Sequence, residues 1–407
     1  LAWSRGLGDV YKRQVFNRKI NSFNFKRVSI LISMEIILVS IFVLGYLAIT
    51  LEHTLKIDKL IPALAMMAIL WAIIALKHMP VFEVDTSLKQ LVPSHIDEIL
   101  LHHLGKTAEI IIFLLGAMTI VEIIDYFNGF STIKSFIKTK SKKVLLWIFA
   151  ILAFILSAII DNLTATIVLI TILQKVIGDR DTRLWFAGLI IISANAGGAW
   201  SPIGDVTTTM LWIANKVTTL KLISYLFIPS VVCVVVPVFV ASLLPAFKGN
   251  IEENDTEDEE VIHKYGSTML YLGLAAIVFV PVFKTITHLP PYMGMMFSLA
   301  VVSTFAEIFS ATKINITSID EDSDAASHHS PVHKSLSKIE LPSILFFLGI
   351  LLAVAALESL GMLFGFAETL NTAIPNTDIV IMLLGIGSAV IDNVPLVAAS
   401  ILSLIHI

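Results

Sequence analysis

Long runs of hydrophobic residues, separated by short polar segments, make up most of the sequence. Several of these runs contain enough residues, about 20, to cross the roughly 30 Å hydrocarbon core of a lipid bilayer as a helix. The clearest runs cover residues 28–50, 60–76, 108–124, 222–244, 268–283, 292–311 and 341–364. This pattern predicts an all-α polytopic membrane protein.

Other hydrophobic runs are too long for one straight helix or are interrupted by helix-breaking residues. They cover residues 144–177, 184–214 and 379–407. Glycine and proline destabilise a helix interior, and a broken backbone survives in lipid only where protein or a water-filled cavity satisfies its polar groups. We therefore predict broken transmembrane helices. A hinge of unwound backbone is expected at Gly197, Gly198, Pro202 and Gly204.

Composition agrees with a membrane protein and excludes several other classes. Hydrophobic residues make up 56% and charged residues 15% of the 407 positions, whereas soluble domains carry about 25% charged residues. The net charge of -4 gives no sign of a nucleic-acid partner. The single cysteine, Cys233, excludes a disulfide framework. The sequence has no P-loop lysine, metal-binding histidine pair or nucleophile elbow, so we expect neither ATP-driven pumping, enzymatic activity nor a bound cofactor.

Two short motifs occur twice at almost the same spacing. The sequence SAIIDN at residues 157–162 recurs as SAVIDN at residues 388–393, and FLLG at residues 113–116 recurs as FFLG at residues 346–349. Such self-similarity indicates a duplicated unit. Transporters are commonly built from two repeats, often inverted in the membrane, with the substrate held between them.

Asp161, Asp205 and Asp392 each provide the only fixed charge within a long hydrophobic run. A charge near the bilayer centre costs about 2.5 to 3.5 kcal/mol, so we expect these residues to have a function. Their neighbours carry amide and hydroxyl oxygens, which together with carboxylates suit Na⁺. Because burial favours the neutral form of a carboxyl group, the same group can bind a proton when the cation leaves.

The predicted ion-binding and proton-coupling residues share these oxygen-bearing side chains. They are Asp161, Asn162, Thr164, Ser193, Asn195, Asp205, Thr207, Thr208, Asp392 and Asn393, with Na⁺ expected at Asp161, Asn162, Asp392 and Asn393. A structural alternative stays open for each aspartate, namely a helix cap that accepts hydrogen bonds from backbone N–H groups. This alternative is strongest for Asp205, which follows Pro202 and Gly204.

Three segments resemble those of the NhaD-type sodium/proton antiporters of the ion transporter superfamily. They are SAIIDNLTATIVLIT at residues 157–171, SANAGGAWSPIGDVTTTMLW at residues 193–212 and SAVIDNVP at residues 388–395, within a likeness that covers about residues 28–400. The middle segment is long and specific, whereas the Asp-Asn motif is shared with arsenite permeases and dicarboxylate carriers. The resemblance implies export of Na⁺ or Li⁺ in exchange for H⁺.

The same resemblance implies two inverted repeats whose re-entrant hairpins and broken helices meet at the ion site. Asp161 and Asn162 would lie at the tip of the first hairpin, Asp392 and Asn393 at the tip of the second, and residues 193–208 on the first broken helix. The partner of the middle segment would fall beyond residue 407, so we expect the second repeat to be truncated.

Two other functions compete with cation exchange. An anion permease for arsenite or a dicarboxylate would use helix N-termini and few acidic residues at its site, so the lone aspartates count against it. An intramembrane protease could use Asp161 and Asp392 as a carboxyl pair, but their asparagine neighbours suit cation binding better. The sequence therefore favours a secondary transporter that exchanges Na⁺ or Li⁺ for H⁺.

The polar segments divide the chain. Residues 80–106 mix polar and hydrophobic positions and predict an amphipathic helix at the membrane interface, while residues 252–260 are acidic and residues 320–338 polar, which predicts solvated loops. The expected organisation starts with an N-terminal tail (1–27) and leading transmembrane helices with the amphipathic segment (28–107), followed by the first repeat core with its hairpin and broken helix (108–245). An acidic loop (246–267), connecting helices with a polar loop (268–340) and the incomplete second repeat (341–407) complete the chain. Within the tail, residues 1–14 resemble translated cloning sequence and are expected to be non-native.

We expect the protein to be integral to a membrane, namely the bacterial inner (plasma) membrane. Its expected partners are the lipid bilayer and the transported cations, without nucleic acid, and the sequence leaves a homodimer open.

Overall fold

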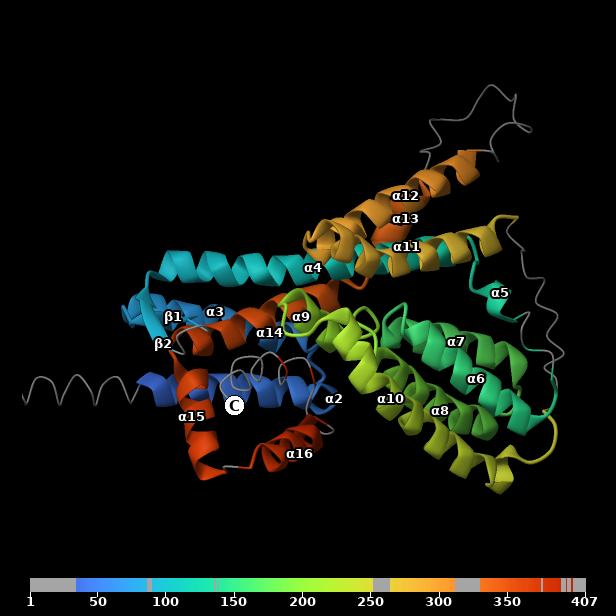
Figure 1. Cartoon of the computed structure of the whole chain (residues 1–407), viewed down its shortest axis with the longest axis horizontal. Helices are drawn as coiled ribbons and strands as arrows, with labels where there is room; N and C mark the ends of the chain where they lie inside the picture. Colours follow the sequence, from blue (N-terminus) through green and yellow to red (C-terminus); the bar gives the residue numbers. More distant parts are fainter. Residues whose placement is uncertain are drawn as a thin grey trace, which may run out of the picture. The chain divides into compact units, whose positions relative to one another are not determined.

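The chain is predominantly helical in a computed structural model (Figure 1). The structure describes residues 34–85, 90–134, 137, 139–251, 264–311, 330–374, 376–388, 393 and 397. These residues form two compact units. The first unit contains the described parts of 1–101 and 345–395, and the second contains those of 102–344 and 396–401.

The first unit is built from apolar helices and one β-hairpin. Its elements are the helical residues Met34–Thr50, α2 (Glu52–Leu55), α3 (Leu60–Leu76), β1 (Val81–Asp85), β2 (Gln90–Ser94), the start of α4 (Ile96–Tyr126), most of α14 (Leu341–Ser359), α15 (Met362–Ala373) and α16 (Thr377–Ser388). The indole Nε1 of Trp71 donates a hydrogen bond to the carbonyl oxygen of Leu352 at 2.9 Å. A Cβ atom on Gly349 would lie 2.8 Å from the carbonyl carbon of Ala63, so this glycine lets α3 and α14 pack closely.

The prediction of one amphipathic helix over residues 80–106 is wrong. Strands β1 and β2 pair antiparallel, with Val81 opposite Ser94 and Asp85 opposite Gln90, and helix α4 begins only at Ile96. Hydrophobic and acidic residues alternate over residues 82–85 of β1, which is the period of a strand, and this local alternation outweighs the helical prediction for the whole segment. The protein is therefore mostly helical rather than all-α.

The second unit contains the remaining helices. They are the rest of α4, α5 (Ser131–Lys134), α6 (Lys142–Ser157), α7 (Asn162–Val176), α8 (Arg180–Ala199), α9 (Val206–Ile213), α10 (Thr219–Ser242), the 3₁₀ helix η1 (Pro245–Phe247), α11 (Gly266–Thr287), α12 (Pro291–Ala311) and α13 (Pro331–Lys338). Helix α13, which packs against α12, replaces the end of the loop expected over residues 320–338. It begins with proline at its first turn, a position that proline favours. The acidic segment 252–260 lies outside the described residues.

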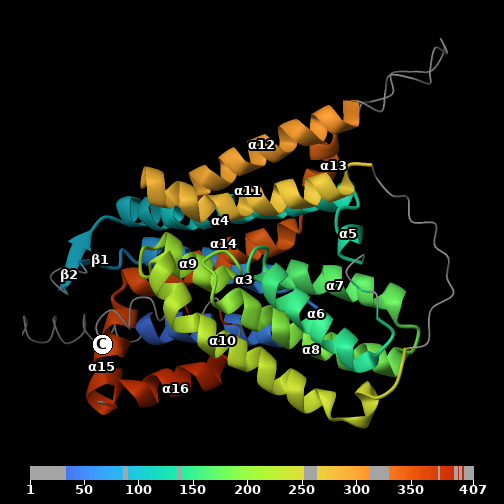
Figure 2. The same cartoon turned by 45° about the vertical axis from the view of Figure 1, so that its right-hand side comes forward.

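Helix α8 lies among α6, α7 and α10 in this unit. It packs against all three helices, and Figures 1 and 2 show the four side by side. Helices α11 and α12 pack against each other and run along α4 in both views. Gly116 of α4 lies against the side chains of Met295 and Met296 on α12. The glycines of the two repeated FxLG motifs thus both lie at close helix contacts, and the repeat itself stays a prediction.

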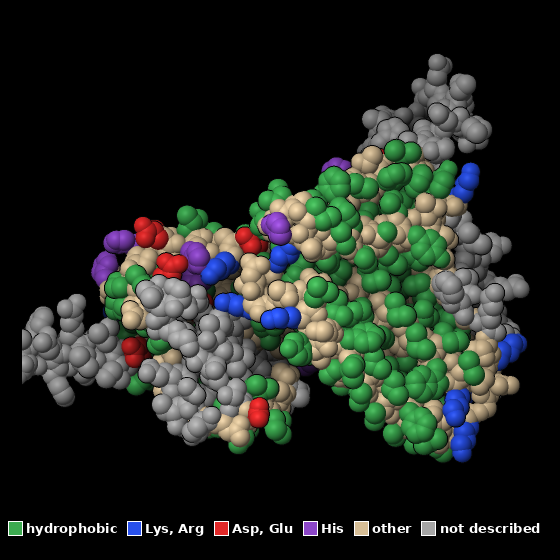
Figure 3. Space-filling view, viewed as in Figure 1, with side chains coloured by type: hydrophobic (Ala, Val, Ile, Leu, Met, Phe, Trp, Pro, Cys, Tyr) green, Lys and Arg blue, Asp and Glu red, His purple; other side chains and the backbone are tan. Residues whose placement is uncertain are grey.

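The described helices fit a polytopic membrane protein. Five of them, α4, α10, α11, most of α12 and α14, are long and apolar enough to cross a bilayer. Helix α10 exposes large hydrophobic side chains such as Leu220 (81%) and Ile228 (70%). Figure 3 shows hydrophobic side chains spread over the face of the second unit, with lysine and arginine at its margin. Such a surface suits lipid better than water.

Candidate functional site

Helices α8 and α9 are separated by the non-helical residues 200–205, which we call the interruption. A Cβ atom on Gly204 would lie 2.4 Å from the carbonyl oxygen of Ser157, and one on Gly197 would lie 2.3 Å from that of Phe154. The absence of a side chain at these glycines therefore lets the last turn of α8 and the interruption pack directly against the backbone of α6. Their role as a hinge stays a prediction.

The interruption frees backbone carbonyl groups that side chains of α9 then satisfy. The hydroxyl of Thr208 donates to the carbonyl oxygens of Ser201 at 2.8 Å and Asp205 at 2.9 Å. The hydroxyl of Thr209 donates to the carbonyl oxygen of Pro202 at 3.0 Å. Freed carbonyl groups within a membrane need such partners. Thr208, which the sequence places in the ion site, therefore has a structural role in this geometry.

Asp161 lies in the short turn between α6 and α7 and caps the N-terminus of α7. Its Oδ1 accepts hydrogen bonds from the backbone N–H groups of Leu163 at 2.9 Å and Thr164 at 3.0 Å. Its Oδ2 accepts a hydrogen bond from the hydroxyl of Thr164. The N-terminus of a helix attracts negative charge, so a carboxylate suits this position.

Asp205 caps the N-terminus of α9 in the same way. Its Oδ2 accepts hydrogen bonds from the backbone N–H of Thr207 at 3.1 Å and from the hydroxyl of the same residue. Its Oδ1 accepts a hydrogen bond from the side-chain amide of Asn162 at 3.2 Å. The cap that the sequence offered as a structural alternative is thus present at both described aspartates.

Asn162 joins three helices through one amide group. Its Nδ2 donates to Oδ1 of Asn195 at 2.7 Å as well as to Asp205, and Asn195 in turn donates to the carbonyl oxygen of Ile191 at 2.9 Å. We call Asn162, Asn195 and Asp205 the amide cluster. Asn195 is exposed, and the other two side chains are half-buried. The cluster therefore presents carboxylate and amide oxygens at an accessible place beside the interruption.

Ser193, which the sequence also places in the ion site, does not join the amide cluster. Ser193 is completely buried, and its hydroxyl has no hydrogen-bond partner among the described residues. It precedes Asn195 by two positions on α8, which turns its side chain about 200° around the helix axis. Asn393 is helical and exposed, and Asp392 lies outside the described residues. No group of three or more His, Cys, Asp or Glu side chains in the described part of the chain could hold a metal ion.

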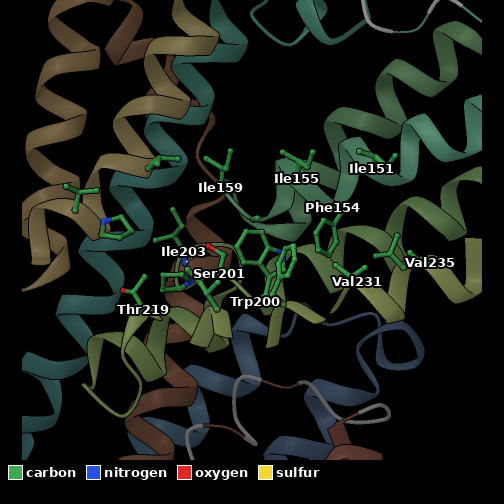
Figure 4. A pocket seen from close by; sticks show the side chains of 18 of the residues that line it. Ile151, Phe154, Ile155, Ile159, Trp200, Ser201, Ile203, Thr219, Val231 and Val235 are labelled. Carbon is green, nitrogen blue, oxygen red and sulfur yellow. Dashed lines mark hydrogen bonds between the residues drawn. The ribbon is translucent and has the colours of Figure 1, made fainter. Parts of the chain in front are cut away.

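An apolar cavity of about 700 Å³ lies on another side of the interruption. Figure 4 shows Trp200, Ser201 and Ile203 facing it together with Phe154 of α6 and Val231 of α10. The residues of the amide cluster are not among those that line it. Because its walls are mostly hydrocarbon, with Ser201 and Thr219 as the hydroxyl side chains in the lining, this cavity suits a cation less well than the amide cluster does.

Lys284 of α11 contacts the C-terminal end of α9, a contact that sequence reasoning missed. Its Nζ donates to the carbonyl oxygen of Trp212 at 2.9 Å and to Oδ1 of Asn215 at 3.1 Å, and lies 4.5 Å from the centroid of the Trp212 ring. The only signal in the sequence is a lone cation directly after the hydrophobic run 268–283. The partners come from helix packing, which no local motif reports.

Comparison with known proteins places the chain in a family. A family model described as "Citrate transporter" matches residues 29–407. The chain belongs to this transporter family. Because the match covers nearly all of the chain, both units are parts of one integral membrane transporter.

Several proteins that are similar to this chain in sequence are named as antiporters. Sodium/proton antiporter 1 of Arabidopsis thaliana is 38% identical over 371 residues, which are 90% of this chain and 60% of the relative. Sodium/proton antiporter 2 of the same plant is 36% identical over 88% of this chain and 81% of its own length. The Na⁺/H⁺ antiporter NhaD of Vibrio cholerae is 30% identical over 88% and 76%. The resemblance to NhaD-type proteins is confirmed, and the chain spans less than two thirds of the first of these relatives.

Proposed function

We propose that the chain is the part of a secondary transporter that exchanges Na⁺ or Li⁺ for H⁺, with Asp161 and the amide cluster at its ion site. The observation that carries the proposal is the amide of Asn162, which joins Asn195 and Asp205 where α7 and α9 begin. The printed names of the relatives support the same activity. Asp392 and Asn393 remain the predicted second half of the site.

In the proposed cycle, Na⁺ binds to carboxylate and amide oxygens while Asp161 and Asp205 are ionised. A proton that binds to either carboxylate removes the negative charge that attracts the cation. Na⁺ and H⁺ therefore exclude each other at the site. Alternating access of the site to the two sides of the membrane then turns this exclusion into exchange.

The rival cargo is an anion, because the family description names citrate. Helix N-termini attract anions through free N–H groups and the positive end of the helix dipole. Here the N-termini of α7 and α9 are already engaged by Asp161 and Asp205 of the chain itself. A second anion at the same place would meet these negative charges, so the arrangement favours a cation.

The finer assignments of membrane and assembly are also proposals. An inner membrane of bacteria fits the NhaD relative from Vibrio cholerae, whereas the Arabidopsis relatives allow other membranes. Contact with lipid follows from the exposed hydrophobic faces of α10 and α11. A homodimer stays a prediction from the sequence.

Everted membrane vesicles that contain the full-length protein test the proposed function. We expect added Na⁺ to dequench a dye that reports the pH gradient, and we expect Asp161→Asn and Asp205→Asn each to abolish this response. Asparagine is nearly as good a helix cap as aspartate, so both substitutions remove the charge while retaining the cap. Loss of exchange would therefore report the charge rather than misfolding.

Asp179 supplies the matched control. It caps α8 by accepting a hydrogen bond from the backbone N–H of Thr182 at 2.9 Å. Hydrogen bonds from the side chain and the backbone of Thr182 lower the pKa of Asp179, so it is ionised throughout the neutral range and Asp179→Asn also removes a charge. We expect this variant to exchange like the wild type. Wild-type exchange by both Asp161→Asn and Asp205→Asn would contradict the site, and citrate uptake without Na⁺-dependent dequenching would support the rival cargo.

A further inference from the structure

Helix α9 depends on contacts at both of its ends. It contains eight residues, which span about 12 Å, and a helix this short is not stable by itself in water. Its N-terminal end is held by the cap of Asp205 and by the hydroxyls of Thr208 and Thr209, which bond to the interruption. Whatever holds its C-terminal end therefore also helps to fix the carboxylate of Asp205.

Lys284 is the side chain that holds this C-terminal end. Two hydrogen bonds join its ammonium group to the carbonyl oxygen of Trp212 and to the side chain of Asn215. The free carbonyl groups at a helix C-terminus carry partial negative charge, which a cation stabilises, and the ring of Trp212 adds a cation–π contact at 4.5 Å. Glu109 of α4 also interacts electrostatically with Lys284.

The contacted end of α9 is well buried. Trp212 is 2% exposed and meets Phe113 of α4 edge to face at a centroid distance of 6.4 Å. A hydrophobic residue in place of Lys284 could pack against this indole ring, but it could not donate a hydrogen bond to the carbonyl oxygen of Trp212, which also accepts one from the backbone N–H of Asn215 at 3.2 Å. Lys284 lies in the last turn of α11 and is half-buried, so its aliphatic stem can pack between the helices while its ammonium group reaches the end of α9.

We propose that Lys284 is a positioning residue, which anchors the C-terminal end of α9 and so keeps Asp205 in the geometry that binds the cation. The inference rests on the proposed function. Because α9 is short and helical, a displacement at Trp212 is transmitted to its cap. Loss of the anchor therefore weakens Na⁺ binding at a distance from the lysine.

The test uses the purified full-length protein in liposomes. We would measure the Na⁺ concentration for half-maximal exchange, the maximal rate and their pH profiles, together with the melting temperature with and without Na⁺. Lys284→Met should raise the half-maximal Na⁺ concentration about tenfold, as expected for loss of a charged hydrogen bond, with little change in maximal rate. Lys284→Arg, which retains the charge and the donors, should recover most of the affinity.

Two further variants keep the test decisive. Asn215→Gly removes one partner of Lys284 and tolerates the left-handed backbone at this position, where φ is 55°; it should raise the half-maximal Na⁺ concentration about threefold. Lys221→Met, at an exposed position of α10, should behave like the wild type. If Lys284→Met does not fold, Asn215→Gly and Lys284→Arg decide.

Distinct results separate this inference from the proposed function. A wild type with neither Na⁺-dependent exchange nor a Na⁺-dependent rise in melting temperature overturns both. A wild type that shows both, alongside Lys284→Met and Asn215→Gly variants with unchanged half-maximal Na⁺, overturns only the positioning role. A purely structural role for Lys284 would lower the melting temperature without Na⁺ and leave the Na⁺ dependence of the folded protein unchanged.

Discussion

At the scale of single residues, the aspartates Asp161 and Asp205 act as helix caps and carry the charge that the proposed exchange needs. An ionised carboxylate offers about four lone-pair sites. Asp161 accepts three hydrogen bonds from Leu163 and Thr164, so capping leaves capacity for a further ligand. A cap and a cation site are therefore compatible at the same side chain.

The hydrogen bonds of the Asn162 and Asn195 amides lead to a prediction about Na⁺ affinity. Asn162→Ala and Asn195→Ala should each raise the half-maximal Na⁺ concentration of exchange about tenfold, because each removes one partner of a hydrogen bond beside Asp205. Because the two residues contact each other, the double variant should be little worse than either single variant. Additive losses in this double-mutant cycle would show that the two amides act separately.

The sequence motifs predicted much of this residue-level arrangement. Asn162, Asn195 and Asp205 were expected in one site, and their side chains do meet. Ser193 was expected there too, but the helical period turns it away from Asn195. The contact of Lys284 could not be predicted, because its acceptor is a backbone carbonyl whose position depends on how α9 and α11 pack.

At the scale of elements, the interruption between α8 and α9 was predictable because glycine and proline act locally on the backbone. The hairpin of β1 and β2 was not predicted, because each strand has only five residues and the short alternation over residues 82–85 was interpreted as part of one longer amphipathic segment. Helix α13 was missed because its polar sequence depends on packing against α12. Hydrophobic runs alone therefore do not predict the structure of segments of mixed polarity.

Two Gly→Ala substitutions test whether the interruption packs closely against α6. Gly204→Ala should lower the stability by about 1 to 3 kcal/mol, because the new methyl group would lie 2.4 Å from the carbonyl oxygen of Ser157. Gly188→Ala on α8 has no atom within 4 Å of the new methyl group and should be neutral or slightly stabilising. The melting temperatures of the purified variants measure this difference. Equal melting temperatures would contradict the close packing of the interrupted segment.

At the scale of the whole molecule, the family match and the hydrophobic surface agree on a membrane transporter. The match covers residues 29–407, and helices apolar enough to span a bilayer occur in both units. The motif glycines Gly116 and Gly349 make close contacts in one unit each, which fits the predicted duplication. In the proposed function the cargo follows from local charge, because helix N-termini that the chain's own carboxylates already occupy favour a cation over citrate.

The central claim is that Na⁺ and H⁺ compete for the same carboxylates, and calorimetry of Na⁺ binding to the purified full-length protein tests it most directly. Titrations in buffers with different ionisation enthalpies count the protons released for each Na⁺ bound. We expect the wild type to release protons, with Na⁺ affinity falling as the pH is lowered, and we expect Asp161→Asn and Asp205→Asn to lose this release. Na⁺ binding without proton release in the wild type would contradict the account.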